Sequence, residues 1–427
     1  MHAIGIDIGT TSICGVVVDI KTGEVLKSIT KDSNAFIYGT ADWEKTQSPE
    51  KIIAIATEVL ESLLSDQVAV IGVTGQMHGI VYVDGEGKAV SPLYTWQDGR
   101  GNQPYEGTTY AEYLGSCSGY GCVTDFYNRK NGLVPKEAAA FCTIHDYFVM
   151  TVCGLKKPNI HITDAASFGL FDLQSKQFTC ENGVPFTEGY KIAGYYQNIP
   201  VGMAIGDNQA SVLTSLTGEK ELLINIGTGS QVSVLCDRIK TCENVETRPF
   251  FEGKYLVVGS ALCGGRAYAM LKEFYKTVLV AKVPIEDGEV YGLMDRFLET
   301  ADCMGLCVDT RFAGTRADET IRGSIQNISV DKFTPAALTK GVLEGMIREL
   351  HDMYVAMDVP VNRVIGSGNG IRKNKALVRT AEEIFGCPIT IAVCTEEAAF
   401  GAALYGMLAA GHYSSMREAA YTFSAKT

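Results

Sequence analysis

A glycine-rich turn near the start of the chain carries residues that could bind phosphate. It reads Gly9-Thr-Thr-Ser12 and follows a short apolar run that contains Asp7. Glycines let backbone N–H groups approach phosphate oxygens closely, and a carboxylate between apolar neighbours is costly unless it has a partner. We therefore interpret Asp7 as the residue that holds a hydrated Mg²⁺ beside a phosphate bound at Thr10, Thr11 and Ser12. The alternative is a glycine turn with a capping aspartate.

A second turn repeats the first about halfway along the chain. Residues 4–18 read IGIDIGTTSICGVVV, and residues 222–235 read LLINIGTGSQVSVL. An apolar run, a glycine turn and a returning apolar run form the pattern of a β-hairpin. Gly227 and Thr228 stand in the second turn, and two such hairpins could grip one polyphosphate from both sides. The repeat predicts two domains of related topology that flank a cleft.

Asp207 is the candidate general base. It follows a predicted strand at 202–205 and precedes a run rich in Ala, Ser and Val that predicts a helix. A carboxylate at that place can accept a proton from a sugar hydroxyl while the hydroxyl attacks a phosphoryl group. We count the adjacent Asn208 with Asp207 as substrate-binding. The alternative is that Asp207 only caps the helix.

The segment Thr74-Gly-Gln-Met-His-Gly79 is a candidate sugar-binding loop, because it ends a predicted strand at 68–73. Glutamine and histidine side chains offer several hydrogen bonds to hydroxyl groups. Gln76, Met77 and His78 are therefore predicted to face the ligand. The alternative is a histidine whose hydrogen bonds are satisfied within the protein.

The segment Trp96-Gln-Asp-Gly-Arg100 follows shortly afterwards and also suits a polyol. Trp96 offers an aromatic face, and Asp98 offers a carboxylate that can accept hydrogen bonds from hydroxyls. Both are predicted to bind substrate. The alternative is a turn held by an ion pair between Asp98 and Arg100.

Two further glycine clusters, CGGR and GSGNG, open predicted helices in the second half. They supply Gly264 and Gly265 in the first cluster, and Gly368 and Asn369 in the second. Backbone without side chains could pass under an adenine and the α-phosphate with little steric hindrance. Neither cluster is the G-x-G-x-x-G fingerprint of dinucleotide-binding folds, and no Walker A motif occurs.

Helical and strand patterns alternate in both halves of the chain. The helices and strands that they predict carry the candidate site residues. Ser48 and Thr334 are each followed by proline and then by apolar residues at helical spacing, which predicts two capped helices. Short apolar runs at 68–73, 363–365 and 389–392 predict strands, and a helix is predicted to run through Glu383. The fold class is therefore α/β with mixed sheets.

Composition and charge exclude several classes of protein. A length of 427 residues with 46% hydrophobic and 20% charged residues predicts more than one globular domain. The net charge of −12 comes without a basic footprint, so no nucleic-acid partner is expected. No apolar run of about 18 residues and no signal-peptide pattern occur, and the 13 cysteines are scattered. We expect a cytoplasmic protein without a membrane partner, and a homodimer is compatible with the sequence.

These motifs, in this order, resemble the FGGY carbohydrate kinases, members of the actin/Hsp70/sugar-kinase superfamily. The resemblance covers essentially the whole chain and rests on IGIDIGTTS, TGQMHG, TWQDGR, IGDNQAS, INIGTGSQ, GSGNGIRKN and EEAAFGAAL. It implies two RNase H-like α/β domains with mixed sheets flanking a cleft. Residues 1–217 would form an N-terminal domain that binds the sugar, and residues 218–427 a C-terminal domain that binds ATP.

The resemblance also implies roles for single residues. Asp207 matches the catalytic base of an ATP-dependent ketose kinase, and Asp7 matches an aspartate associated with Mg²⁺. The phosphate hairpins are matched by Thr10, Thr11, Gly227 and Thr228, the sugar segments by Gln76, His78 and Asp98, and the nucleotide side by Gly264, Gly265, Gly368 and Asn369.

The substrate that the resemblance implies is a ketose. Segments between residues 119 and 168 resemble family members that convert sedoheptulose to sedoheptulose 7-phosphate, whereas TGQMHG and GDN are shared with members that act on xylulose. Xylulose or another sugar is therefore the alternative. A superfamily member that senses sugar or nucleotide without catalysis is the alternative of another class, and the presence of Asp207 argues against it. A chaperone-like ATPase would need a peptide-binding domain, for which the length leaves little room.

Overall fold

The chain forms two compact units. The computed structural model describes residues 1–39, 41–181, 183–216, 220–242, 244–281, 284–300, 306–315, 318, 320–392 and 394–424. Unit 1 comprises Met1–Gly218, Arg248–Tyr255 and Glu396–Thr427, and unit 2 comprises Glu219–Thr247 and Leu256–Thr395. Residues 217 and 218, the predicted domain boundary, lie outside the described residues. That boundary stays a prediction, and the observed grouping differs from it by assigning two later segments to unit 1.

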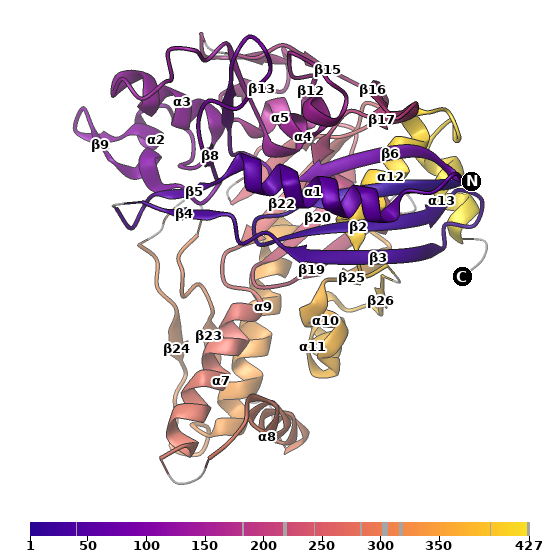
Figure 1. Cartoon of the computed structure of the whole chain (residues 1–427). Helices are drawn as coiled ribbons and strands as arrows, with labels where there is room; N and C mark the ends of the chain where they lie inside the picture. The colour runs from indigo at the N-terminus through magenta and orange to yellow at the C-terminus, as the bar shows by residue number, and fades with distance from the viewer. Residues whose placement is uncertain are drawn as a thin grey trace. The chain divides into compact units, whose positions relative to one another are not determined.

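A mixed sheet forms the centre of unit 1 (Figure 1). Its strands are β1 (His2–Ile8), β2 (Ser12–Asp19), β3 (Val25–Asp32), β6 (Val68–Gly75), β16 (Ile192–Tyr196), β17 (Ile199–Gly202) and β18 (Ile205–Gly206). The strand order is β16-β17-β6-β1-β2-β3, and β18 pairs with β6 beside this path. β1 pairs antiparallel with β2 and parallel with β6, so the hairpin predicted for residues 4–18 is confirmed.

Unit 2 is built on a second sheet. Its strands are β19 (Glu221–Ile226), β20 (Ser230–Cys236), β21 (Val245–Pro249), β22 (Tyr255–Ala261), β25 (Arg363–Ser367) and β26 (Ile389–Ile391). The order is β21-β22-β20-β19-β25-β26, with β19 antiparallel to β20 and parallel to β25. β22-β20-β19-β25-β26 therefore repeats the arrangement β3-β2-β1-β6-β17. The internal repeat marks two α/β units with mixed sheets of RNase H-like order, as predicted.

Helices and short strands complete the two units. Unit 1 holds α1 (Pro49–Leu63), α2 (Tyr110–Tyr113), α3 (Gly121–Lys130), α4 (Ile144–Val152), α5 (Ile162–Ser167), α6 (Asp207–Ser215), α12 (Glu397–Ala409), α13 (Met416–Ser424) and the 3-10 turn η1 (Gly99–Asn102). Its short strands are β4 (Phe36–Tyr38), β5 (Lys45–Gln47), β7 (Val81–Val83), β8 (Leu93–Tyr94), β9 (Pro104–Tyr105), β10 (Thr108–Thr109), β11 (Ala140–Cys142), β12 (Ile160–His161), β13 (Phe171–Asp172), β14 (Gln177–Phe178) and β15 (Phe186–Thr187). Unit 2 holds α7 (Gly265–Leu279), α8 (Asp287–Thr300), α9 (Pro335–Met357), α10 (Asn369–Lys373), α11 (Lys375–Phe385), β23 (Cys307–Asp309) and β24 (Ser324–Gln326).

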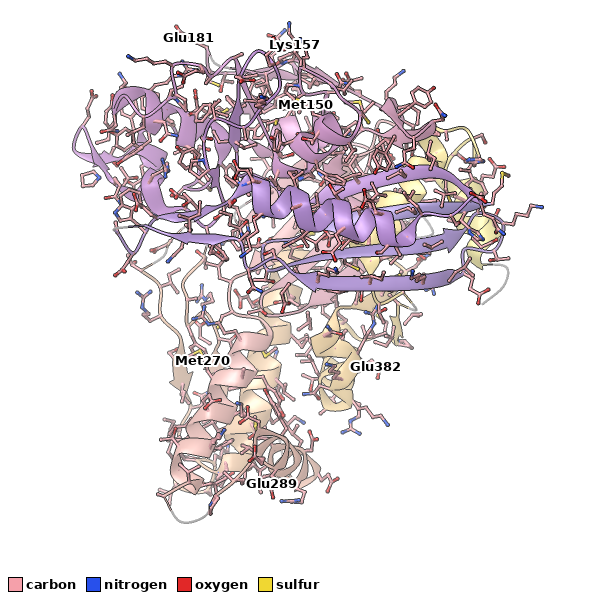
Figure 2. The ribbon with its side chains drawn as sticks, viewed as in Figure 1. Met150, Lys157, Glu181, Met270, Glu289 and Glu382 are labelled. Atoms are coloured by element: carbon pink, nitrogen blue, oxygen red, sulfur yellow. The ribbon has the colours of Figure 1, made fainter. Side chains whose placement is uncertain are left out.

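The predicted helix starts are confirmed, and two predicted elements are divided. The Ser48 side chain accepts a hydrogen bond from the Lys51 N–H at the start of α1, and Thr334 caps α9 in the same way. The strand predicted at 202–205 is two short strands, β17 and β18. The helix predicted through Glu383 is α10 followed by α11, because the Asn374 side chain caps a new helix. Glu382 of α11, labelled in Figure 2, accepts a hydrogen bond from the Ile389 N–H (3.2 Å), which connects α11 to β26.

Two helices cover opposite faces of the unit 1 sheet. A Cβ at Gly15, which is paired with Ile6, would meet side chains of α1. A Cβ at Gly5, the neighbour of Ile6, would lie 1.8 Å from the Ala399 carbonyl oxygen of α12. Adjacent strand residues point to opposite faces, so α1 and α12 sandwich the sheet. Met150 of α4, labelled in Figure 2, lies in a separate apolar cluster of unit 1.

The described residues include no helix long and apolar enough to cross a membrane. The same part of the chain contains twelve cysteines, and all of them are free thiols. The elements that position the site are therefore held by packing and hydrogen bonds.

We expect Gly72→Ala to destabilise the protein, because a Cβ at Gly72 would lie 1.7 Å from the carbonyl oxygen of Ala402 in α12. Forcing an extra methyl group into a packed contact costs about 1–3 kcal/mol of unfolding free energy. Gly85→Ala is the matched control, because a Cβ there would meet nothing within 4 Å. Chemical denaturation of both variants and the wild type measures the difference. Equal stability of all three would contradict the close approach of β6 and α12.

Candidate functional site

Strand register brings two aspartates to one edge of the unit 1 sheet. Asp7 is paired with Thr74 of β6, and Thr74 is paired in turn with Ile205 of β18. The Thr74 hydroxyl donates to the Ile205 carbonyl (2.6 Å), which fixes this junction. Asp207 is the first residue of α6, directly after β18. The N-cap of α6 is Gly206, so the alternative that Asp207 serves as the helix cap is not what the structure shows.

The backbone before Asp207 is held from two sides. The Gly206 N–H donates to the Thr163 hydroxyl of α5 (3.3 Å). A Cβ at Gly206 would lie 2.7 Å from the sulfur of Met77, so this side chain packs directly against the glycine. Met77 itself is buried. Met77 therefore packs against the residue that precedes the candidate base. The predicted contact of Met77 with a sugar stays a prediction.

Carboxylates crowd this edge of the sheet. Burial raises the pKa of Asp7 to about 8, and the negative charges of Asp207 and Glu396 add to the effect. Burial also raises the pKa of Asp207, but the nearby His145 and Arg248 lower it and so favour the ionised base. The Arg248 guanidinium also donates to the Asn208 side-chain oxygen (3.1 Å). No local sequence pattern predicts Glu396, His145 or Arg248 as site residues.

Asp7 fits a cation that keeps most of its ligands as water or phosphate. Its Oδ1 atom is buried and has no hydrogen-bond partner within the protein. No group of three or more His, Cys, Asp or Glu residues could hold a metal ion, as far as the described residues go. Mg²⁺ commonly binds through one or two carboxylates together with water and substrate phosphate. A carboxylate with one unpaired oxygen is consistent with that kind of site.

A buried histidine–aspartate pair lies near the candidate base. His145 of α4 has its Nε2 atom 3.0 Å from Oδ1 of Asp164 in α5, and both side chains are fully buried. Burial lowers the pKa of His145, whereas burial and the charge of Asp207 raise the pKa of Asp164. In the sequence, the segment around His145 is distinguished only by its resemblance to the family. The two residues are 19 positions apart in the chain, so no local sequence pattern predicts that their side chains meet.

Three predicted residues from separate motifs are joined by hydrogen bonds. The Trp96 indole N–H donates to the Thr10 hydroxyl (3.0 Å), and this hydroxyl donates to the Gln76 side-chain oxygen (3.1 Å). The Trp96 side chain remains accessible, since the residue is 41% exposed. Gln47, which the sequence analysis did not single out, bonds to both Thr10 and Gln76. The predicted phosphate turn and the predicted sugar loop thus meet within unit 1.

His78 is held in an unusual conformation. Its φ is 73°, in the left-handed region that few non-glycine residues adopt. Its ring stacks on Tyr120 with centroids 4.2 Å apart, and its Nδ1 atom lies 2.7 Å from the Ser167 carbonyl oxygen. A carbonyl only accepts, so Nδ1 carries the proton and Nε2 is the acceptor in the neutral ring. Strain of this kind often accompanies a functional role.

Asp98 is engaged within the protein. Its carboxylate accepts from the Arg100 guanidinium at 2.6 and 3.2 Å and from the Lys45 N–H at 3.1 Å. Arg100 also lies over the Tyr94 ring, and both charged residues are buried. These contacts favour the alternative of a turn held by an ion pair, while sugar binding by Asp98 stays a prediction.

In unit 2 the second glycine turn meets the starts of two helices. The Gly265 N–H of α7 donates to the Gly227 carbonyl (2.9 Å), and the Arg266 N–H donates to the Thr228 carbonyl (3.0 Å). A Cβ at Gly264 would lie 2.5 Å from the backbone of Gly229.

The other helix, α10, begins at Asn369 after Gly368, which has a φ of 84°. A Cβ at Gly368 would lie 2.6 Å from the Ile226 carbonyl oxygen. The predicted nucleotide residues of unit 2 therefore gather around one turn, and close backbone approach requires glycine at Gly264, Gly265 and Gly368.

Comparisons with known proteins give the family. Residues 2–124 match the N-terminal domain, and residues 222–410 the C-terminal domain, of the FGGY family of carbohydrate kinases. The chain is 29% identical to sedoheptulokinase of Mus musculus, over 94% of this chain and 96% of that protein. It is 23% identical to a xylulose kinase of Staphylococcus xylosus, over 98% of this chain and 92% of that protein.

Solved structures show the same fold. A ligand-bound xylulose kinase from Lactobacillus acidophilus superposes with a TM-score of 0.85 at 18% identity, covering 99% of this chain and 92% of that one. A glycerol kinase of Plasmodium falciparum with ADP gives 0.75 at 16% identity, covering 99% of this chain and 92% of that one. The matched domains and the shared fold lead to one conclusion: this chain belongs to the FGGY family of carbohydrate kinases and is a sugar kinase.

Proposed function

We propose that this chain transfers the γ-phosphoryl group of ATP to a hydroxyl of a ketose, with sedoheptulose as the substrate and sedoheptulose 7-phosphate as the product. The observation that carries the reaction is Asp207 at the edge where β1, β6 and β18 end, next to the loop that holds His78. Sedoheptulose is favoured because sedoheptulokinases of Mus musculus and Homo sapiens match at 29% and 28% identity. Xylulose is the second candidate, since xylulose kinases also match along the chain.

Asp207 acts as the general base in this proposal. Its carboxylate accepts the proton of the attacking hydroxyl, which makes the sugar oxygen a better nucleophile for phosphorus. The positive charge of Arg248 opposes the effect of burial and so helps to keep Asp207 ionised. The hydrogen bond from the Gly206 N–H to the Thr163 hydroxyl keeps the Asp207 carboxylate at the strand edge. In this proposal His78 contacts a sugar hydroxyl, while Tyr120 and Ser167 fix its ring.

The phosphate and nucleotide contacts follow from each unit's own geometry. In unit 1, Asp7 would hold Mg²⁺, which supplies positive charge to the phosphate oxygens when bound. Thr11 and Ser12 offer donors from the adjacent turn. In unit 2, the assigned contacts are Gly227, Thr228, Gly264, Gly265, Gly368 and Asn369. α7 contributes a helix N-terminus of the kind that attracts phosphate.

A coupled assay of the wild type with MgATP and a panel of sugars tests the proposal. We expect the highest kcat/KM with sedoheptulose, a lower value with xylulose, and little turnover with glycerol or gluconate. Each protein donor or acceptor that a poorly matched sugar leaves unpaired lowers the binding free energy by about 1–3 kcal/mol. A clear preference for xylulose would change the proposed substrate but leave the proposed reaction unchanged. No phosphorylation of any ketose would contradict the proposed function.

Asp207→Asn should lower kcat by about 10²-fold or more, because the amide keeps the shape but cannot accept the proton. Since burial raises the pKa of Asp207 above the usual aspartate range, wild-type kcat should fall on acidification within that raised range, as the base becomes protonated. The residual kcat of Asp207→Asn should not show this fall on acidification. Asp352→Asn, on an exposed part of α9, is the matched control. Near-normal kcat in Asp207→Asn would remove Asp207 from the base role.

His78→Ala should raise the sugar KM or lower kcat/KM by about 10- to 100-fold, with little change in the ATP KM. His78→Gly is the matched variant, because it also lacks the imidazole but tolerates the positive φ. Both variants should show the same kinetic defect, whereas only the alanine should suffer the added backbone strain. The sugar KM, the ATP KM and the melting temperature are measured on one preparation. Normal sugar kinetics with reduced stability would make His78 a purely structural residue.

A further inference from the structure

Three side chains of unit 1 form a closed ring of hydrogen bonds around the first glycine turn. Gln47 Nε2 donates to the Thr10 carbonyl (2.7 Å), and Gln47 Oε1 accepts from Gln76 Nε2 (3.0 Å). Gln76 Oε1 accepts from the Thr10 hydroxyl (3.1 Å), which closes the ring. The Trp96 indole N–H is attached to it at the Thr10 hydroxyl (3.0 Å). Gln47 is 0% exposed, so it cannot itself touch a substrate.

The direction of every bond in the ring is fixed by two groups that can act in only one way. The Thr10 carbonyl can only accept, so the Gln47 amide must turn its NH₂ group toward it. Gln47 Oε1 then faces Gln76, which must offer its own NH₂ group there and its oxygen to Thr10. The Thr10 hydroxyl therefore gives its single proton to Gln76. The Trp96 indole, which can only donate, agrees with this direction because it needs the hydroxyl oxygen as its acceptor.

This polarity bears on phosphate binding, because phosphate oxygens only accept hydrogen bonds. A Thr10 hydroxyl whose proton is given to Gln76 has nothing to donate to a phosphoryl group. The same hydroxyl instead joins the turn to the loop that leads to His78. Thr11, which is exposed, and Ser12 have side chains outside this ring.

We propose that Gln47 is a positioning residue that fixes the polarity of this ring, so that the Thr10 side chain aligns the phosphate turn with the sugar loop and does not bind phosphate itself. This inference rests on the proposed function, since it assigns roles within the same site. It revises the expectation that Thr10 binds phosphate through its hydroxyl, and it assigns those contacts to Thr11 and Ser12. A displacement of about 1 Å in a reacting group can cost about 10²-fold in rate.

A double-mutant cycle on the full chain tests the shared role. We expect Gln47→Leu and Thr10→Val each to lower kcat on the best ketose by about 10- to 100-fold, with KM for sugar and ATP changed less than about threefold. The double variant should be no worse than the poorer single variant, because both substitutions open one ring. Losses that multiply in the double variant would mean that Thr10 acts on phosphate independently, and would overturn the proposal.

Two matched variants separate positioning from support of the fold. Ser33→Ala removes another hydrogen bond to the same Thr10 carbonyl (3.1 Å) but leaves the ring closed, so kcat should stay within about threefold of wild type. Gln47→Glu can restore the donor to Thr10 only when its carboxyl is protonated. Its kcat relative to wild type should therefore rise as the pH is lowered. A Ser33→Ala defect as large as that of Gln47→Leu would overturn the proposal, as would a Gln47→Glu ratio independent of pH.

A spectroscopic measurement reads the ring without any turnover. The chain has two tryptophans, so a ¹H–¹⁵N spectrum shows two indole signals, which Trp43→Phe assigns. Thr10→Val and Gln47→Leu should shift the Trp96 signal and leave that of Trp43 in place, whereas Ser33→Ala should shift neither. A Trp96 signal that does not move in Thr10→Val would overturn the ring. If the wild type phosphorylates no ketose, the proposed function fails, but this spectrum still shows whether the ring of hydrogen bonds is present.

Discussion

Crowding of like charges at one sheet edge is the constraint on which unit 1 depends. Burial makes ionisation of Asp7 costly, and the negative charges of Asp207 and Glu396 add to that cost. Such a cluster persists only if the backbone that carries it cannot relax apart. The parallel pairing of β1 and β6 and the glycine contacts with α12 supply that rigidity. A bound cation would offset this repulsion, because its positive charge favours the ionised carboxylates.

Local patterns in the sequence predicted several of the elements, whereas the chemical role of Asp207 stays a prediction. The glycine turns predicted the two hairpins, and Ser48 and Thr334 predicted helix starts, because a cap and its helix lie within a few residues of each other. The position of Asp207 at a strand–helix junction followed from the same kind of pattern. The same order of five strands in both sheets shows that the sequence echo reflects the fold of both units.

Other features depend on contacts between distant residues, and no local pattern reveals them. Gln47 meets Gln76 across 29 positions, and Cys14 donates to Glu396 across 382. Asp98 shows the opposite difficulty, since its residue type suited a sugar but its oxygens are taken by Arg100 and Lys45. A sequence shows which groups a segment offers. Whether those groups are already occupied depends on the segments that arrive from elsewhere in the chain.

The packing of α12 on β1 and β6 has a consequence for how the molecule is made. The first strand of unit 1 begins at residue 2, yet the helix that covers one face of its sheet begins at residue 397. During synthesis on the ribosome, that face has no native cover until almost the whole chain has emerged. The sheet of unit 2 is also completed late, because its strand β26 ends at residue 391. Asp7 is therefore among the first residues to be translated, but the packing around its strand is among the last to become native.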